Sequence, residues 1–92
     1  MQSLDIPVRL RAELTEAMLD YMRKHSDIDA RKYKLTNILN DWRARPIPVI
    51  DKFEIEYSES NLATIYLWDI PAVFPQYVIS LDLTVKSEDI PE

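Results

Sequence analysis

Side chains that could perform acid–base or nucleophilic chemistry are few in this chain of 92 residues, which has one histidine and no cysteine. His25 lies where a helix is expected to end, and a histidine there more often supplies a favourable charge to the helix dipole than catalysis. Two carboxylate pairs, Asp27 with Asp29 and Glu54 with Glu56, have the residue type that general acid–base work needs. Helix capping accounts for the first pair, and the wet face of a strand accounts for the second. We therefore predict no catalytic residue and a protein that is not an enzyme.

The absence of two residue types excludes further chemistry. Without cysteine there are no disulfides, thiolate nucleophiles or cysteine-based zinc sites. Without glycine the chain cannot form a P-loop, a dinucleotide fingerprint or a nucleophile elbow, because each needs backbone positions that glycine supplies. No calcium-loop spacing follows Asp27 and Asp29. We expect no metal ligand and no cofactor.

Charge is divided unevenly along the chain, whose net charge is −5. Residues 1–48 hold nine basic and seven acidic side chains, a net +2, and residues 49–92 hold two basic and nine acidic ones, a net −7. This asymmetry indicates two surfaces with different partners, although solvated carboxylates are also common on strands. The chain begins without the features of a signal peptide, and no apolar run approaches the roughly 20 residues of a membrane span. We expect a cytoplasmic protein with no membrane partner.

The first half begins with a change of hydrophobic period. Residues 4–10 alternate apolar and polar side chains, which predicts a half-buried strand, and Pro7 places that strand at a sheet edge. From Leu10 onward the apolar residues follow helical spacing, which predicts a helix over residues 11–25.

A second helix is expected to run to about residue 43. Ser26, Asp27 and Asp29 are its candidate N-caps, and its apolar stripe ends at Trp42. The proline-containing residues 46–48 then stop the helix and form a connector.

The second half predicts three strands, at residues 53–57, 62–68 and 77–85. The first two are joined by a polar turn at residues 58–61, and the last two by a loop with two prolines at residues 69–76. The strands should form an antiparallel meander whose apolar face the two helices cover.

These elements predict an α+β fold of order β-α-α-β-β-β. A strand-helix-helix region at residues 1–45 precedes an antiparallel β region with an acidic tail at residues 46–92, and both belong to one compact domain. A thin core of this size would gain from dimerisation, and we expect a homodimer.

Residues 4–42 resemble the ribbon-helix-helix family of small dimeric DNA-binding proteins. The resemblance lies in the alternating strand at residues 4–10, the Ala12-Glu13-Leu14 opening of the first helix, the short loop and the second helix. It implies that two chains pair their strands into a ribbon whose outward side chains enter the major groove, and that amides at the start of the second helix bind phosphate. Asp5 and Pro7 also lie at outward positions, where they do not suit DNA contact. The residues expected to contact DNA are Ser3, Arg9, Arg11, Arg31, Lys32 and Lys34. Alternatively, residues 4–10 add a fourth strand to the C-terminal sheet, and no ribbon forms.

The acidic second half has candidate residues for binding another protein. Of its aromatic residues most are expected in the core, but loop residues Ile70, Val73 and Phe74 fall outside the strand alternation and are candidates for an exposed apolar patch, or for a lid on the meander. The neighbouring carboxylates Glu54, Glu56 and Asp69 suit a basic partner.

Two functions follow from these patterns. The first is a small non-catalytic regulatory protein, a ribbon-helix-helix-like DNA-binding regulator or antitoxin-like repressor. The alternative is an acidic protein-interaction module or inhibitor that binds a basic partner protein through its C-terminal sheet and loop.

Overall fold

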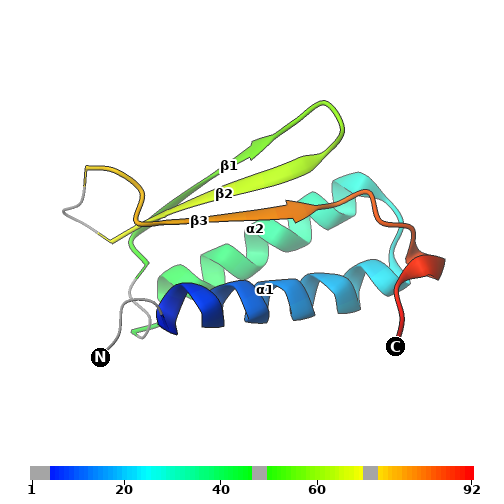
Figure 1. Ribbon diagram of the computed structural model, residues 1–92, viewed down its shortest axis with the longest axis horizontal. Helices are drawn as coiled ribbons and strands as arrows, with labels where there is room; N and C mark the ends of the chain where they lie inside the picture. The colour runs from blue at the N-terminus through cyan, green and yellow to red at the C-terminus, as the bar shows by residue number, and fades with distance from the viewer. Residues whose placement is uncertain (1–4, 47–49, 70–72) are drawn as a thin grey trace.

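A computed structural model describes residues 5–46, 50–69 and 73–92, with side chains from residue 8 onward. Two helices precede an antiparallel sheet, and both helices lie on one side of that sheet (Figure 1). The elements are α1 at Asp5–Lys24, α2 at Ile28–Ala44, β1 at Lys52–Tyr57, β2 at Leu62–Trp68, β3 at Tyr77–Asp82 and the short 3-10 helix η1 at Ser87–Asp89.

The predicted N-terminal strand is wrong, so the fold is α+β with the order α-α-β-β-β. Residues 5–10 form the beginning of α1, and Leu4 and Ser3 lie outside the described residues. A strand would turn Val8 and Leu10 to the same face, but Val8 is 68% exposed and Leu10 only 2%. Pro7 is compatible with this helix because the amides of a first helical turn have no partner within the helix.

Residues 5–10 adopt a helix rather than a strand because the helical conformation extends the apolar stripe of the following residues. Leu10, Leu14, Met18 and Met22 follow each other at intervals of four residues, and all four are buried. The helix therefore begins six residues earlier than predicted. In this conformation Leu10 packs in the core, which an edge strand ending at Leu10 would not allow.

Helix α2 forms as the sequence indicates. The Asp27 side chain caps it by accepting a hydrogen bond from the Ala30 amide at 2.9 Å. Leu35, Leu39 and Trp42 are its buried apolar residues, and the helix ends before Pro46, which cannot continue it.

The sheet is a three-stranded antiparallel meander of order β1-β2-β3. In its register Ile55 of β1 pairs with Ile65 of β2, which pairs with Ile79 of β3. The turn before β2 contains Asn61 with a positive φ of 63°, a conformation that asparagine tolerates better than most residues in a chain without glycine. Strand β3 ends at Asp82, earlier than predicted, because the Asp82 carboxylate accepts a hydrogen bond from the Thr84 amide and turns the chain.

One apolar core lies between the helices and the inner face of the sheet. Its buried members come from both halves of the chain: Leu10, Leu14, Met18, Met22, Leu35, Leu39, Trp42, Ile50, Ala63, Ile65, Leu67, Ile79, Leu83 and Ile90. The two helices are therefore held to each other and to the sheet by the same cluster.

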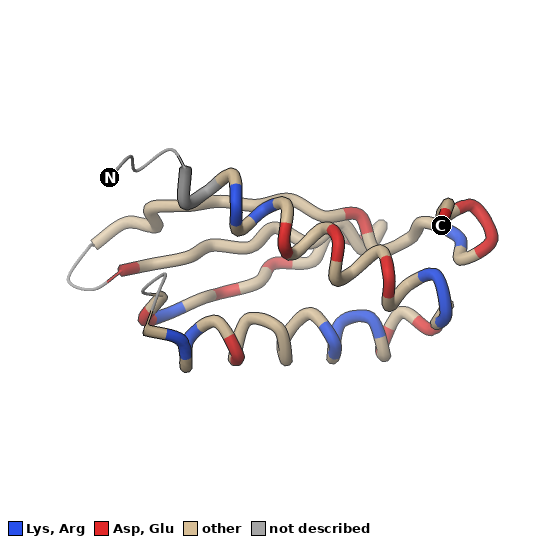
Figure 2. Tube along the Cα trace, turned by 90° about the horizontal axis from the view of Figure 1, so that it is seen from below, with Lys and Arg blue, Asp and Glu red and all other residues tan. Residues whose placement is uncertain are grey.

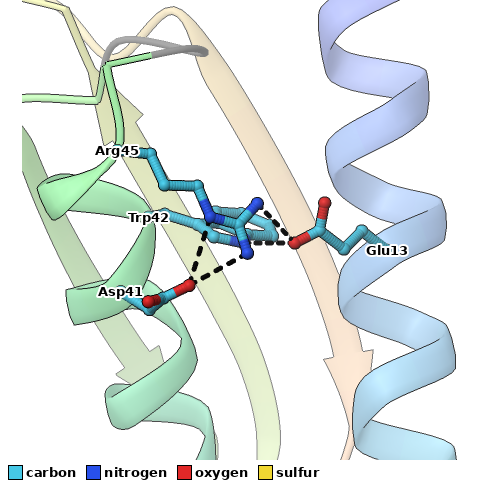
Figure 3. A network of polar contacts seen from close by, with 4 residues as sticks. All are labelled: Glu13, Asp41, Trp42 and Arg45. Atoms are coloured by element: carbon cyan, nitrogen blue, oxygen red, sulfur yellow. Dashed lines mark hydrogen bonds and ion pairs between the residues drawn. The ribbon is translucent and has the colours of Figure 1, made fainter.

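A polar network joins the helices above this core (Figure 3). The Trp42 indole donates to the Glu13 carboxylate at 2.9 Å, and the same carboxylate pairs with Arg45 at 2.8 Å. Arg45 also donates to Asp41, and hydrogen bonds to Asp41 and Glu13 raise the pKa of the Arg45 guanidinium above its ordinary value. The network satisfies the one polar atom of the buried Trp42 side chain.

The described part of the chain contains no helix with both the length and the apolar character that crossing a bilayer requires.

Candidate functional site

The face of the sheet opposite the helices is left uncovered by the described elements (Figure 1). We call this surface the open face. Side chains alternate along a strand, so the register assigns to it the outward residues of each strand. These are Lys52, Glu54 and Glu56 of β1, Leu62, Thr64, Tyr66 and Trp68 of β2, and Val78, Ser80 and Asp82 of β3.

The open face is more apolar than a solvated sheet face needs to be. Leu62 and Val78 are exposed, and Tyr66, which is opposite Val78 in the register, and Trp68 are only half-buried. A sheet face that only meets water usually carries polar and charged side chains, as β1 does here. Exposed aromatic and aliphatic residues at the centre of a face with acidic residues on both sides are typical of a binding surface.

Two aromatic side chains of the central strand β2 lie on the open face. The Tyr66 and Trp68 rings have centroids 6.4 Å apart and are tilted by 45°. The Tyr66 hydroxyl donates to the Glu56 carboxylate at 2.7 Å, and this hydrogen bond raises the pKa of Tyr66. The bond links the aromatic pair to β1 and fixes the direction of the Tyr66 ring.

A lysine of the protein itself lies on the half-buried Trp68 side chain. The Lys52 ammonium is 4.6 Å from the centroid of the Trp68 ring and 3.4 Å from a Glu54 carboxylate oxygen. Lys52 and Trp68 are directly opposite in the register, so strand pairing brings them together. The open face therefore has a place where a cation meets an indole ring and a carboxylate.

The loop between β2 and β3 extends this surface. Val73 and Phe74 are 82% and 79% exposed, and the Trp68 indole donates to the Val73 carbonyl at 3.3 Å. Asp69 is partly buried, with its amide bound to the Gln76 side chain, and Ile70 lies outside the described residues. Of the predicted partner-binding residues, Glu54, Glu56, Val73 and Phe74 thus reach solvent on or beside the open face.

The residues predicted to bind DNA are not gathered in one place. Ser3 lies outside the described residues, and Arg9 and Arg11 are exposed near the start of α1. Lys32 and Lys34 are at the start of α2, which lies beside the other end of α1, and Figure 2 shows basic segments spread along the helices. With a rise of about 1.5 Å per residue, the two groups are separated by most of the length of α1.

Arg31 is buried, so it does not offer a cation to a phosphate. It is 2% exposed, and its guanidinium donates to the carbonyls of Met22, His25, Leu83 and Val85 and to the Ser87 hydroxyl, at 2.7 to 3.0 Å. Two of these carbonyls are at the C-terminal end of α1, where the helix dipole favours a cation. Arg31 therefore fastens the helix pair to the C-terminal segment.

The residues considered for acid–base chemistry make contacts within the fold. His25 is exposed and stacks on Tyr21 with ring centroids 4.0 Å apart, and Asp27 is the N-cap of α2. Within residues 5–46, 50–69 and 73–92, no three metal-binding side chains converge.

Two hollows lie away from the open face. One of about 330 Å³ is at the end of the molecule where the α1–α2 connection meets residues 84–88, and Arg31 lines it with its donors already used. The other, of about 240 Å³, lies between the helices beside the Glu13–Arg45 pair.

The central residues of the open face were missed by sequence reasoning. Most aromatic residues of the second half were expected in the core, because aromatic residues on a strand usually are, and Tyr66 and Trp68 were not singled out. The sequence of β2 does indicate which of its two faces is buried. Ala63, Ile65 and Leu67 on one face are all apolar, whereas the other face includes the polar Thr64. Two helices can cover only one face, and the purely apolar set takes the covered one.

Comparison of the chain with protein-family models, with curated proteins and with solved structures found no match.

Proposed function

We propose that the protein is a small non-catalytic binding module that attaches to a basic segment of a partner protein through its open face. The observation that carries the proposal is the aromatic and aliphatic centre of an uncovered sheet face, Leu62, Tyr66, Trp68 and Val78, beside exposed carboxylates. Burial of tyrosine and tryptophan is a large source of affinity in protein interfaces, and flanking charge selects the partner.

Charge complementarity identifies the kind of partner. Glu54, Glu56 and Asp82 lie on the open face at both of its edges, and residues 49–92 have a net charge of −7. A partner segment with lysine or arginine residues around an apolar centre would match both features. Regulation or inhibition of that partner by covering its basic surface is the simplest role for such a module.

The ribbon-helix-helix interpretation depends on a strand that is not formed, because residues 5–10 belong to α1. With Arg31 buried, and with Arg9 and Arg11 separated by most of the length of α1 from Lys32 and Lys34, the residues predicted to contact DNA are not gathered on one surface that would favour DNA over protein. The acidic open face would repel phosphate.

The test is quantitative capture from the native cell with and without nuclease, using the full chain and two matched tyrosine variants. Tyr66→Ala removes a tyrosine from the open face, and Tyr33→Ala removes an exposed one from α2. We expect a partner that resists nuclease, is lost from Tyr66→Ala and is retained by Tyr33→Ala. Equal capture by both variants, or capture that disappears with nuclease, overturns the proposal.

A homodimer is a separate proposal, supported by the exposed edge of β3. Strand β1 alternates charged side chains along its edge, whereas β3 carries no charge between Tyr77 and Leu81. Within the described residues, β3 has one strand neighbour, β2. Unprotected edges favour pairing with another strand, and a second β3 would continue the sheet. Light scattering should give about twice the 10.8 kDa chain mass, and a mass equal to one chain excludes the dimer.

A further inference from the structure

The contact between Lys52 and Trp68 indicates what kind of ligand would suit the open face. Lys52, Glu54 and Trp68 come from two adjacent strands, and the register places Lys52 opposite Trp68 and Glu54 opposite Tyr66. The Lys52 ammonium contacts the indole ring at 4.6 Å and Glu54 at 3.4 Å. Two attractive groups for a cation are thus positioned together by the backbone.

Lys52 occupies this position weakly. Both Lys52 and Glu54 are more than half exposed, so solvent screens their attraction, and the lysine loses side-chain entropy when it is held there. A flexible lysine can move from the ring without any change in the strands. The position is therefore available to a cation that binds it better.

We propose, on the basis of the proposed function, that Trp68 and Glu54 form a recognition site for an arginine side chain of the partner, and that Lys52 fills this site in the free protein. A guanidinium is planar, so it stacks flat on an indole and at the same time directs two parallel N–H groups to one carboxylate. An ammonium makes one point contact and keeps its hydration more tightly.

Of the two carboxylates of β1 on the open face, Glu54 rather than Glu56 suits the arginine site, because their present contacts differ. The Glu56 carboxylate already accepts a hydrogen bond from the Tyr66 hydroxyl at 2.7 Å, so it is engaged with Tyr66. The partner that the structure gives the Glu54 carboxylate is Lys52 itself. Release of Lys52 would free both the carboxylate and the ring together, so Lys52 acts as a competitor that sets the affinity for the incoming arginine.

The experiment titrates the full chain with a hexa-arginine amide and, separately, with a hexa-lysine amide. The NMR signal of the Trp68 indole N–H reports binding, and the buried Trp42 indole in the same spectrum is the internal reference. We expect hexa-arginine to bind at least about threefold more tightly than hexa-lysine and to move the Trp68 signal. Trp68→Ala and Glu54→Gln should each weaken hexa-arginine binding by about fivefold or more.

Lys52→Ala and Lys86→Ala form the decisive pair, because each removes one positive charge but only Lys52 contacts Trp68. Lys52→Ala should tighten hexa-arginine binding by about threefold, and Lys86→Ala should change it much less. Equal binding of the two peptides, equal effects of the two lysine variants, or no binding of hexa-arginine overturns the arginine site. If Tyr66→Ala still abolishes partner capture in that case, the proposed function stands and only the arginine site fails.

Discussion

The two faces of the sheet are built from neighbouring residues and have opposite roles. On β2, Ala63, Ile65 and Leu67 are fully buried under the helices, whereas Tyr66 and Trp68, one position along, reach solvent. The covered face is apolar, with aliphatic residues at its centre and Phe53, Tyr57 and Tyr77 packed against them, and it holds the fold together. The open face combines half-buried aromatic rings with exposed carboxylates and a lysine, a mixture of side chains that is typical of binding surfaces. The difference teaches that alternation along one strand can separate the residues that stabilise the fold from the residues that we propose bind a partner.

The covered side should also depend on one buried polar group. Arg31→Met removes a guanidinium that serves four carbonyls and a hydroxyl, and leaves buried acceptors without donors. We expect a loss of about 3 to 5 kcal/mol in the free energy of unfolding, measured by urea denaturation. Arg43→Met on the same helix is the control, because Arg43 is exposed and should change stability by about 0.5 kcal/mol. Equal losses from the two variants would show that Arg31 is not a structural link.

Adjacent residues of β2 test the comparison directly. Ile65→Ala opens a cavity on the covered face and should cost about 2 to 5 kcal/mol of unfolding free energy. Tyr66→Ala on the open face should cost about 1 kcal/mol or less. The two variants are compared by urea denaturation under the same conditions, and a larger cost for Tyr66→Ala would place it in the core.

Two tyrosines with raised pKa values distinguish the faces, because the cause of the shift differs between them. On the covered face burial raises the pKa of Tyr57, while on the open face the hydrogen bond to Glu56 raises the pKa of Tyr66. Glu56→Gln should therefore lower the pKa of Tyr66 toward its ordinary value of 10.0 and leave that of Tyr57 unchanged. NMR titration of the two rings measures both. A raised pKa means that the Tyr66 contact favours the folded state below pH 10 and is lost as the pH rises through the folded-state value.

The smallest effect concerns Asp82 at the end of β3. Hydrogen bonds from the Thr84 hydroxyl and amide lower the pKa of the Asp82 carboxyl below 3.8. This carboxylate stabilises the fold above its unfolded-state pKa, and the contribution is lost as the pH falls through the lower folded-state value. Thr84→Ala removes the hydroxyl donor and should raise the Asp82 pKa toward 3.8, measured by carboxyl NMR titration. Ser80→Ala, on the same strand, should leave it unchanged.

Periodicity predicted much of the fold. The stripe that ends at Trp42 and the cap at Asp27 gave α2, and alternating residues gave the three strands of the meander. It failed at residues 5–10, because a short apolar–polar alternation fits a strand while the longer stripe from Leu10 favours a helix. Longer-range packing decided between the two, since only the helical conformation brings Leu10 into the shared core while leaving Val8 exposed.

The candidate site was only partly predictable. Glu54, Glu56, Val73 and Phe74 were candidates from their charge or from their place in a loop, and all reach solvent. The site depends equally on Tyr66 and Trp68, whose exposure follows from which face the helices cover.

Apart from residues 5–10, the sequence by itself determined the local structure of this protein and the chemistry that it excludes. Without cysteine or glycine it forms no thiolate site and no phosphate-binding glycine loop, and its periods specify two helices and a meander. Only the tertiary structure decided that Arg31 is buried rather than displayed, and that Trp68 meets Lys52 on an uncovered face. Both outcomes depend on pairing between segments far apart in the chain, which no local pattern of residues specifies.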